Sequence, residues 1–202
     1  MTLRFWRNPK SVILGRGQDI TKEVVIKYCL ENNIEIARRI SGGGSVYHDE
    51  GNLNISIFAP KQILEKGSEI VHVQRFFCDL LIRSLREMGF GVTRSNNTNI
   101  IFRGHKISGA ASYFTKEYVL YHATLLHSSD LNHLESSLIH NSGEERLSSR
   151  YQPTTNLNEL DLRGWRRKFI QTVQETFLLD FETLKPHAAE IELAKKLRPV
   201  YS

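Results

Sequence analysis

The first feature that suggests chemistry is a run of three glycines in the segment RRISGGGSVYHD, residues 38–49. Glycine loses more conformational freedom on folding than other residues, so a run of three needs a reason. One reading is a tight turn. The other is a loop whose backbone N–H groups approach an anion such as a phosphate, with a nearby arginine supplying charge. The spacing matches neither a Walker sequence nor a Rossmann fingerprint, and the pattern leaves both readings open.

A lysine and a histidine in two later segments are further candidates. Lys106 opens a predicted strand in GHKISGAAS, residues 104–112, and His122 lies in YHATLLHSSDL, residues 121–131. A lysine at a strand start is commonly solvated, but it can also be a cation fixed over a carboxylate or a phosphate. A strand histidine with apolar neighbours is either a hydrogen-bonded core residue or a catalyst. Residue type alone does not decide between these readings.

The hydrophobic pattern predicts the elements that must position these residues. Alternating apolar residues predict strands over 3–6, 12–14, 34–38, 45–48, 53–59, 91–94, 100–103, 106–113 and 118–126. Helical periodicity predicts helices over 19–32, with Asp19 as N-cap, over 68–88, over 162–177 and from about Pro186 onward. The serine-rich residues 136–155 are expected to form a surface loop. Strands joined by hairpins rather than through βαβ units favour an α+β fold, with mixed or antiparallel sheets packed against helices.

Composition limits the class of protein. The chain has 202 residues, of which 40% are hydrophobic and 24% charged. This composition excludes a disordered chain and predicts a single domain over 1–202, with 161–202 as its helical C-terminal part. No apolar run approaches the ~20 residues of a membrane span, and the first residues contain no secretory signal, so we expect a cytoplasmic protein with no membrane partner. The formal net charge of +5 favours anionic partners, but no motif indicates nucleic acid.

Two cysteines, Cys29 and Cys78, are too few for a disulfide framework. Both fall on predicted helices beside aromatic residues, where cysteine packs as a small hydrophobic side chain. A nucleophilic cysteine would need solvent access and a lowered pKa. We therefore expect both thiols to be buried.

Taken together, the segments are more specific than each one separately. RRISGGGSVYHDEGNLNISIF, GHKISGAAS and YHATLLHSSDL occur in this order and are followed by TNLNEL at residues 155–160. The arrangement resembles the lipoate–protein ligase A family, part of the lipoyl and biotin ligase superfamily, from about Phe5 to Leu160. The resemblance implies an α+β fold related to the catalytic domains of biotin ligases and class II aminoacyl-tRNA synthetases. It also implies an enzyme that uses ATP and Mg²⁺ to convert lipoate to lipoyl-adenylate. The lipoyl group would then pass to a lysine of a carrier domain, such as an E2 subunit of a 2-oxoacid dehydrogenase or the glycine cleavage H protein.

The resemblance also implies roles for individual residues. Lys106 would be catalytic, because its charge would hold the carboxylate and stabilise the oxyanion in both steps. Substrate and nucleotide would be bound by Arg39, Ser41, Gly42, Gly43, Gly44, Val46, Tyr47, His48, Asn97, Asn99, Ser108, Gly109 and His122. Family members commonly have an Asn-Asp pair where this chain has Thr98 and Asn99. The neutral amide oxygen of Asn99 is then the candidate magnesium ligand.

Partners and alternative functions follow from the same resemblance. Single-chain bacterial ligases of the family carry a C-terminal accessory domain that has no counterpart here, so we expect a separate small accessory subunit. Octanoyl transferases and lipoyl amidotransferases of the superfamily use a cysteine nucleophile without ATP, which gives one alternative. A non-catalytic lipoyl-binding homologue, motivated by Asn99, gives the other. The basic cluster of Arg163, Arg166, Arg167 and Lys168 is either a solvated face or a docking surface for an acidic carrier.

Overall fold

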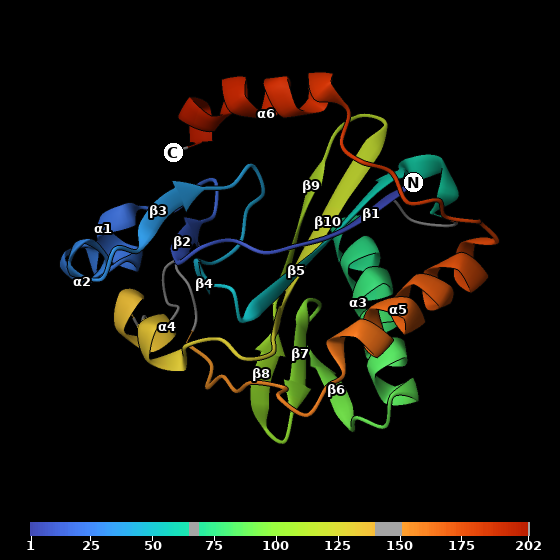
Figure 1. Cartoon of the computed structure of the whole chain (residues 1–202), viewed down its shortest axis with the longest axis horizontal. Helices are drawn as coiled ribbons and strands as arrows, with labels where there is room; N and C mark the ends of the chain where they lie inside the picture. The colour runs from blue at the N-terminus through green and yellow to red at the C-terminus, as the bar shows by residue number, and fades with distance from the viewer. Residues whose placement is uncertain (65–68, 140–150, 202) are drawn as a thin grey trace.

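A four-stranded antiparallel sheet forms the centre of the structure, a computed structural model that describes residues 1–64, 69–139 and 151–201 (Figure 1). In spatial order its strands are β1 (Thr2–Trp6), β5 (Asn52–Pro60), β10 (Tyr118–Leu126) and β9 (Ala110–Phe114). Alternation along β5 buries Ile55 and Ile57 on the inner face of the sheet, as the sequence predicts. The outer face carries polar residues instead, including Ser56 of β5 directly opposite His122 of β10. The candidate site therefore belongs to the outer face.

Two long helices, α3 (Ile70–Glu87) and α5 (Leu162–Phe177), cover the apolar inner face of this sheet (Figure 1). On α5, Trp165 and Phe169 are fully buried at the spacing of one helical turn. The indole Nε1 of Trp165 donates to the Ser84 hydroxyl of α3 at 2.9 Å and so satisfies both buried polar groups. The bounds of α5 agree with those predicted.

A second, smaller sheet holds the strands on either side of the glycine run. Its strand order is β3 (Glu35–Arg38), β2 (Ser11–Leu14) and β4 (Val46–His48). β2 and β3 are parallel and are connected through two short helices, α1 (Ile20–Glu23) and α2 (Ile26–Glu31). The expectation that hairpins alone join the strands was therefore wrong for this βαβ connection.

The single helix predicted over 19–32 is two helices. Asp19 caps α1 as predicted, because its carboxylate accepts the hydrogen bond from the Thr21 backbone at 2.9 Å. Val24 then adopts an extended backbone and forms an isolated bridge with Leu138, far along the chain. This tertiary pairing interrupts the helix, since a β-branched residue gives up helical geometry easily.

A third sheet carries the lysine segment. Its strands are β6 (Val92–Ser95), β7 (Asn99–Phe102) and β8 (His105–Ser108). The strand predicted over 106–113 is broken at Gly109, so that β8 joins this sheet and β9 joins the central one. The Gly109 carbonyl accepts from the Thr124 backbone of β10 at 2.9 Å, and this contact redirects the chain. Lys106 consequently stands where two sheets meet.

The predicted surface loop over 136–155 is only partly a loop. A short helix, α4 (Leu131–Ser137), occupies its beginning, and residues 140–150 lie outside the described part of the chain. The Lys106 backbone N–H donates to the Pro153 carbonyl at 2.8 Å, and Thr155 donates to the Lys106 carbonyl at 3.1 Å. Residues 153–155 therefore run beside β8 as a short parallel neighbour and were wrongly expected to be surface loop.

The remaining elements are the 3₁₀ turn η1 (Lys61–Ile63), which directly follows β5, and α6 (Ala188–Tyr201). Figure 1 shows α6 apart from the central sheet. The mixed and antiparallel sheets packed with helices confirm the α+β class. Among the residues that the structure describes, none of the helices has the length and apolar character needed to cross a bilayer.

Candidate active site

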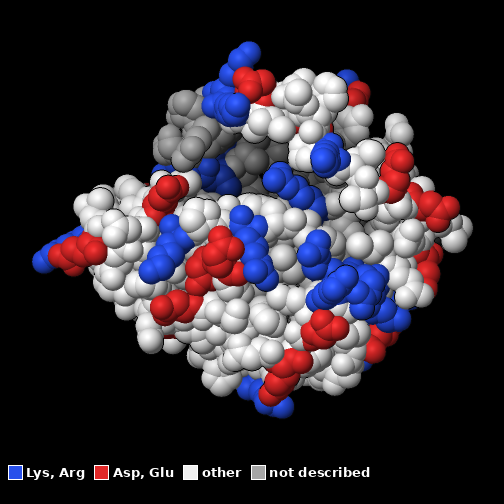
Figure 2. Space-filling view, in the orientation of Figure 1, with Lys and Arg blue, Asp and Glu red and all other residues white. Residues whose placement is uncertain are grey.

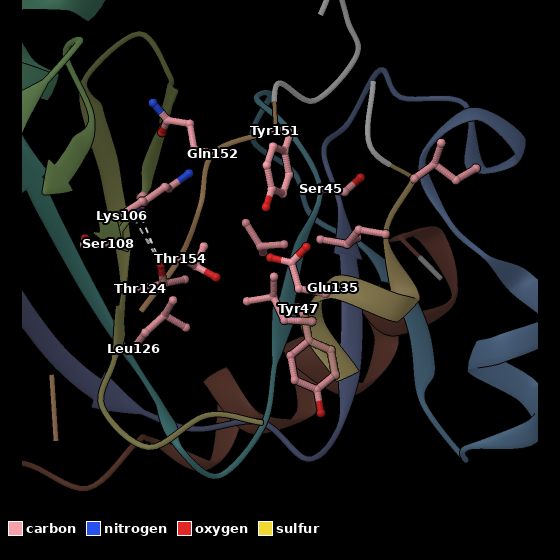
Figure 3. Close-up of a pocket in the computed structure, with 15 residues that line it drawn as sticks. Ser45, Tyr47, Lys106, Ser108, Thr124, Leu126, Glu135, Tyr151, Gln152 and Thr154 are labelled. Atoms are coloured by element: carbon pink, nitrogen blue, oxygen red, sulfur yellow. Dashed lines mark hydrogen bonds between the residues drawn. The ribbon is translucent and has the colours of Figure 1, made fainter. Parts of the chain in front are cut away.

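A cavity lies between the second sheet, β8 and α4. Five of the residues expected at the site line it, namely Val46, Tyr47, Lys106, Ser108 and Gly109. Figure 3 shows Lys106, Thr124 and Thr154 on one side and Ser45 and Glu135 on the other. The ammonium group of Lys106 points toward Gln152 and Tyr151. The glycine segment and the lysine segment thus border one cavity, although about 60 residues separate them.

Lys106 is a half-buried cation that faces this cavity without a counter-ion. Its side chain makes no ion pair or hydrogen bond within residues 1–64, 69–139 and 151–201. Burial lowers the pKa of Lys106, and the nearby positive charge of Arg39 lowers it further. Two cations close enough for one to lower the pKa of the other form a site suited to an anionic ligand.

Gly109 makes room for this lysine. A Cβ atom on Gly109 would lie 2.9 Å from Lys106 Cε, 3.0 Å from Nζ and 3.4 Å from Asn99 Oδ1. Any side chain here would push the ammonium group out of its position. The absence of a side chain at 109 therefore has a direct structural reason, which is to position the catalytic candidate.

Arg39 organises the glycine loop from beneath. Its guanidinium donates to the carbonyls of Ile13 at 3.0 Å, Gly42 at 2.7 Å and Gly44 at 2.7 Å. Its Nε donates to the Ser41 hydroxyl at 3.1 Å. Burial lowers the pKa of Arg39 to about 10, so it stays charged at neutral pH. Protein acceptors take most of the Arg39 donors. Arg39 therefore fixes the backbone of the loop and adds its positive charge to the site without lining the cavity.

Arg38 has a similar structural task in the preceding turn. One of its terminal nitrogens donates to the carbonyls of Gly15 at 2.8 Å and Gln18 at 2.7 Å. The expectation that an arginine of this segment supplies charge to an anion did not include these bonds to backbone carbonyls. The acceptors Gly15, Gln18 and Ile13 lie 20 to 26 residues from their donors in sequence, so no local pattern could have shown these bonds.

The conformation of the glycine loop requires glycine at Gly43, within the loop, and at Gly15, which packs against it. Gly43 has a φ of +91°, which is strained for any residue with a side chain. A Cβ on Gly15, a residue that the sequence did not single out, would overlap the Gly43 carbonyl oxygen. Gly43 also approaches β9, since a Cβ on it would lie 3.6 Å from Ala111 Cβ. Gly42, Gly43 and Gly44 do not line the cavity themselves; they shape the loop that leads into it.

His122 and His48 lie at the base of this loop rather than in the cavity wall. Ser41 accepts from Arg39, so its own hydrogen is available to the neutral Nε2 of His122, 2.6 Å away. The Nδ1 of His48 accepts from the Asn8 amide at 3.1 Å. Burial, with help from Arg39, lowers the pKa of His122 to about 4 and that of His48 to about 3. Both rings are therefore neutral in the folded protein at neutral pH.

These two histidines predict acid sensitivity. Because their pKa values fall from 6.5 on folding to about 4 and about 3, the unfolded chain binds protons first as the pH drops below 6.5. The contribution of the two neutral histidines to the free energy of unfolding is fully present above that pH. It decreases toward pH 4, by on the order of 2 kcal/mol per histidine at pH 5. Denaturant unfolding at pH 7 and pH 5 measures this loss. His122→Gln should reduce the difference between the two pH values, whereas His105→Gln, at an exposed position, should leave it as in the wild type.

Three other expected residues have different environments. The Asn97 Oδ1 accepts from Arg75 at 2.8 Å beside α3, so Asn97 does not border the cavity. The Tyr47 ring packs in the second core against His133, with ring centroids 6.2 Å apart. Ser108 lines the cavity, but its hydroxyl is buried and has no protein partner in the described chain.

The described residues do not fit a resident magnesium ion. No group of three or more His, Cys, Asp or Glu side chains within them could hold a metal. Asn99 donates its Nδ2 to Gln152 Oε1 at 2.7 Å and has the Lys106 ammonium nearby. One neutral oxygen beside a cation is a poor site for a divalent ion, which prefers carboxylates and phosphates. The magnesium expectation for Asn99 gains no support from this arrangement.

The two cysteines are buried, as expected. Burial raises the pKa of Cys29, and it raises that of Cys78 to about 12. A thiol that stays protonated and excluded from solvent cannot act as a nucleophile. Neither cysteine borders the cavity.

Sequence reasoning missed several residues at the site. Thr124, Glu135, Tyr151, Gln152 and Thr154 all line the cavity. Thr154 immediately precedes TNLNEL, so its position beside a motif was the available signal. Asp49, the last residue of the glycine segment, is explained by structure, because its carboxylate accepts from the backbones of Gly51, Asn52 and Asp130.

Comparison with known proteins identifies the family of this fold. The model of the lipoyl protein ligase A/B catalytic domain matches residues 1–181. Lipoate-protein ligase LplJ of Bacillus subtilis is 38% identical over 136 residues, which cover 67% of this chain and 40% of that relative. The chain thus spans well under half the length of this relative.

Solved structures agree. A bi-partite lipoate protein ligase from Thermoplasma acidophilum, described with its E2 lipoyl domain, has a TM-score of 0.82 and 28% identity, over 98% of this chain and 79% of that one. A lipoate-protein ligase A bound with ATP also has a TM-score of 0.82, with 31% identity over 98% of this chain and 81% of that one. The fold, the family model and the sequence identity agree, and the chain belongs to the lipoyl protein ligase A/B catalytic domain family.

Proposed function

We propose that this chain is the catalytic subunit of an ATP-dependent lipoate–protein ligase. It activates lipoate to lipoyl-AMP with release of pyrophosphate, and it then transfers the lipoyl group to a lysine of a carrier domain. Membership of the family and the likeness to an ATP-bound ligase support this proposal. The observation that carries it is the unpaired Lys106 ammonium at the cavity.

The charge arrangement suits both chemical steps. In the first, the lipoate carboxylate attacks the α-phosphate of ATP, so two anions must come together and pyrophosphate must leave. Lys106 and Arg39 provide positive charge before the substrates arrive, which lowers the electrostatic cost of that approach. In the second step, the amine of the carrier lysine attacks the acyl carbon and AMP leaves. Lys106 then stabilises the developing oxyanion.

The partners follow from the second step. An archaeal relative is described as bi-partite and with an E2 lipoyl domain, so we include a lipoyl carrier domain and a small accessory subunit in the proposal. E2 subunits of 2-oxoacid dehydrogenases and the glycine cleavage H protein both present such a lysine. Magnesium would enter with the phosphates of ATP, since the described residues do not form a site for it alone.

Lipoate-dependent exchange between pyrophosphate and ATP tests the proposal. Labelled pyrophosphate should enter ATP only when lipoate is present, with the carrier domain omitted. The assay is run with and without a small accessory subunit of a bi-partite ligase. No exchange under either condition, with transfer from an acylated carrier instead, would establish the acyltransferase alternative. Because both cysteines are buried with raised pKa values, that outcome would also require a mechanism without a thiol nucleophile.

A further inference from the structure

Exposed arginines without an acidic partner gather on the face that carries β1 and α5. This arginine face consists of Arg4, Arg7, Arg163, Arg166 and Arg167. None of them forms an ion pair in the part of the chain that the structure describes, whereas nearby Arg83 and Lys168 are paired with Glu87. Figure 2 shows Lys and Arg side chains spread across the middle of this face, over β1 and α5. Figure 2 also shows Asp and Glu side chains beside them, but the five arginines themselves make no direct ion pair within the described residues.

Aromatic rings hold two of these arginines in place. The Arg4 guanidinium carbon lies 5.8 Å from the centroid of the Trp6 ring, and that of Arg166 lies 4.9 Å from the centroid of Phe5. Phe5 and Trp6 are consecutive on β1 and point to opposite faces of the sheet, Phe5 toward Trp165 of α5 and Trp6 toward Ser56. Because β1 is an edge strand, the two arginines flank this edge from its two sides. A guanidinium held over a ring loses little further freedom on binding, and its N–H groups remain available to a carboxylate.

The arginine face leads directly to the candidate site. The Trp6 ring packs edge-on against His48, with centroids 6.2 Å apart, and its Nε1 donates to Ser56 at 2.9 Å. Ser56 lies opposite His122, which contacts the glycine loop through Ser41. In addition, β1 is an edge strand that pairs only with β5 in the described sheet. A protein bound along β1 would lie next to the loop that borders the cavity.

We infer that the arginine face is the docking surface for an acidic face of the protein that presents the acceptor lysine. This inference rests on the proposed function, since the transfer step needs a protein lysine delivered to the cavity. Planar guanidinium groups match carboxylates in pairs of parallel hydrogen bonds. A single-stranded nucleic acid would instead need aromatic rings free for base stacking. The rings of Phe5 and Trp6 are already covered by Arg166 and Arg4, and Phe5 also packs against Trp165. A protein partner is therefore favoured over RNA.

Charge reversal on this face tests the inference. The variant Arg7→Glu, Arg163→Glu, Arg167→Glu avoids the two stacked arginines. The matched control reverses three exposed lysines elsewhere that make no ion pair within the described residues, Lys116→Glu, Lys185→Glu and Lys196→Glu, for the same change in net charge. Enzyme preloaded with lipoyl-AMP is mixed with the apo lipoyl domain of an E2 subunit, and single-turnover transfer is followed from 20 to about 300 mM salt. The first variant should transfer at least about tenfold more slowly at low salt and should lose most of the salt dependence. The control should behave as the wild type.

The adenylation step separates this inference from the proposed function. Lipoate-dependent pyrophosphate exchange should be unchanged in the arginine-face variant, because its substrates are small molecules. Direct titration of the enzyme with the apo domain should show weaker binding, whether or not chemistry occurs. The inference would be overturned by wild-type transfer and affinity in this variant, or by an equal loss in the control. Absence of exchange in the wild type would instead refute the proposed function, and the titration would still decide the docking surface.

Discussion

Replacing Lys106 with alanine should abolish ligation while leaving the fold intact. Lys106 is the half-buried cation at the cavity, and the approach of two anions depends on charge placed there in advance. Loss of one such stabilising group typically costs about 10²–10³ in rate. We expect lipoate-dependent pyrophosphate exchange and transfer from isolated lipoyl-AMP to fall by at least that factor. Loss of both half-reactions would show that the same ammonium serves the adenylate and the acyl transfer.

Measurements of stability distinguish the proposed catalytic role of Lys106 from a structural one. A structural lysine would be held by partners, and its removal would lower the free energy of unfolding. Lys106 has no side-chain partner in the described residues and has Arg39 as a neighbouring like charge. Removing a partly desolvated, unpaired charge should therefore leave the midpoint of urea unfolding unchanged or raise it. The control Lys116→Ala, at an exposed lysine in a hairpin, should keep both activity and stability. Normal exchange in Lys106→Ala would refute the assigned role.

The sequence predicted the parts of the fold that local pattern determines. The bounds of α5 and β10 agree with the prediction, because each has a strong period and a clear beginning and end. The break at Gly109 was missed, because apolar alternation continues through it. What divides the strand is the hydrogen bond that Thr124 of β10 makes with Gly109. A contact with a distant strand cannot be deduced from the residues on either side of the break.

The same distinction applies to the site. The approach of the glycine segment to Lys106 was expected from the motifs, and the two segments border one cavity. The resemblance implied site roles for both Asn97 and Asn99, yet neither is among the residues that line the cavity, and Asn97 accepts from Arg75 instead. Gln152 and Thr154 were assigned to a surface loop. The backbone pairing of Pro153 with Lys106, which positions them, joins residues 47 apart and leaves no local pattern. Motifs indicate which segments meet, and long-range backbone pairing decides which side chains face the ligand.

The arrangement of hydrogen bonds around Arg39 predicts that Arg39→Lys loses the proposed ligase activity although the charge is kept. Three different nitrogens of Arg39 reach four acceptors, which are Ser41 Oγ and the carbonyls of Ile13, Gly42 and Gly44. A lysine has a single nitrogen and cannot reach acceptors arranged around a planar group. At least two of them lose their donor, at about 1–3 kcal/mol for each buried one. We expect the free energy of unfolding to fall by about 2 kcal/mol or more and pyrophosphate exchange to fall by about 10² or more, since misplaced groups lose rate steeply.

Arg38→Lys is the matched control, because Arg38 makes its three bonds to carbonyl oxygens, those of Gly15, Arg16 and Gln18, through one nitrogen. A lysine ammonium has three hydrogens on one nitrogen and can replace that set after a small shift. Urea unfolding and exchange should therefore remain close to wild type in Arg38→Lys, while both fall in Arg39→Lys. If Arg39→Lys kept full activity, the positive charge beneath the loop would be sufficient, and the position of the glycine loop would not matter for catalysis. If both variants lost activity equally, neither the number of nitrogens nor their geometry would explain the requirement for arginine. The pair thus separates what Arg39 does as a charge from what it does as the residue that fixes the backbone of Gly42 and Gly44.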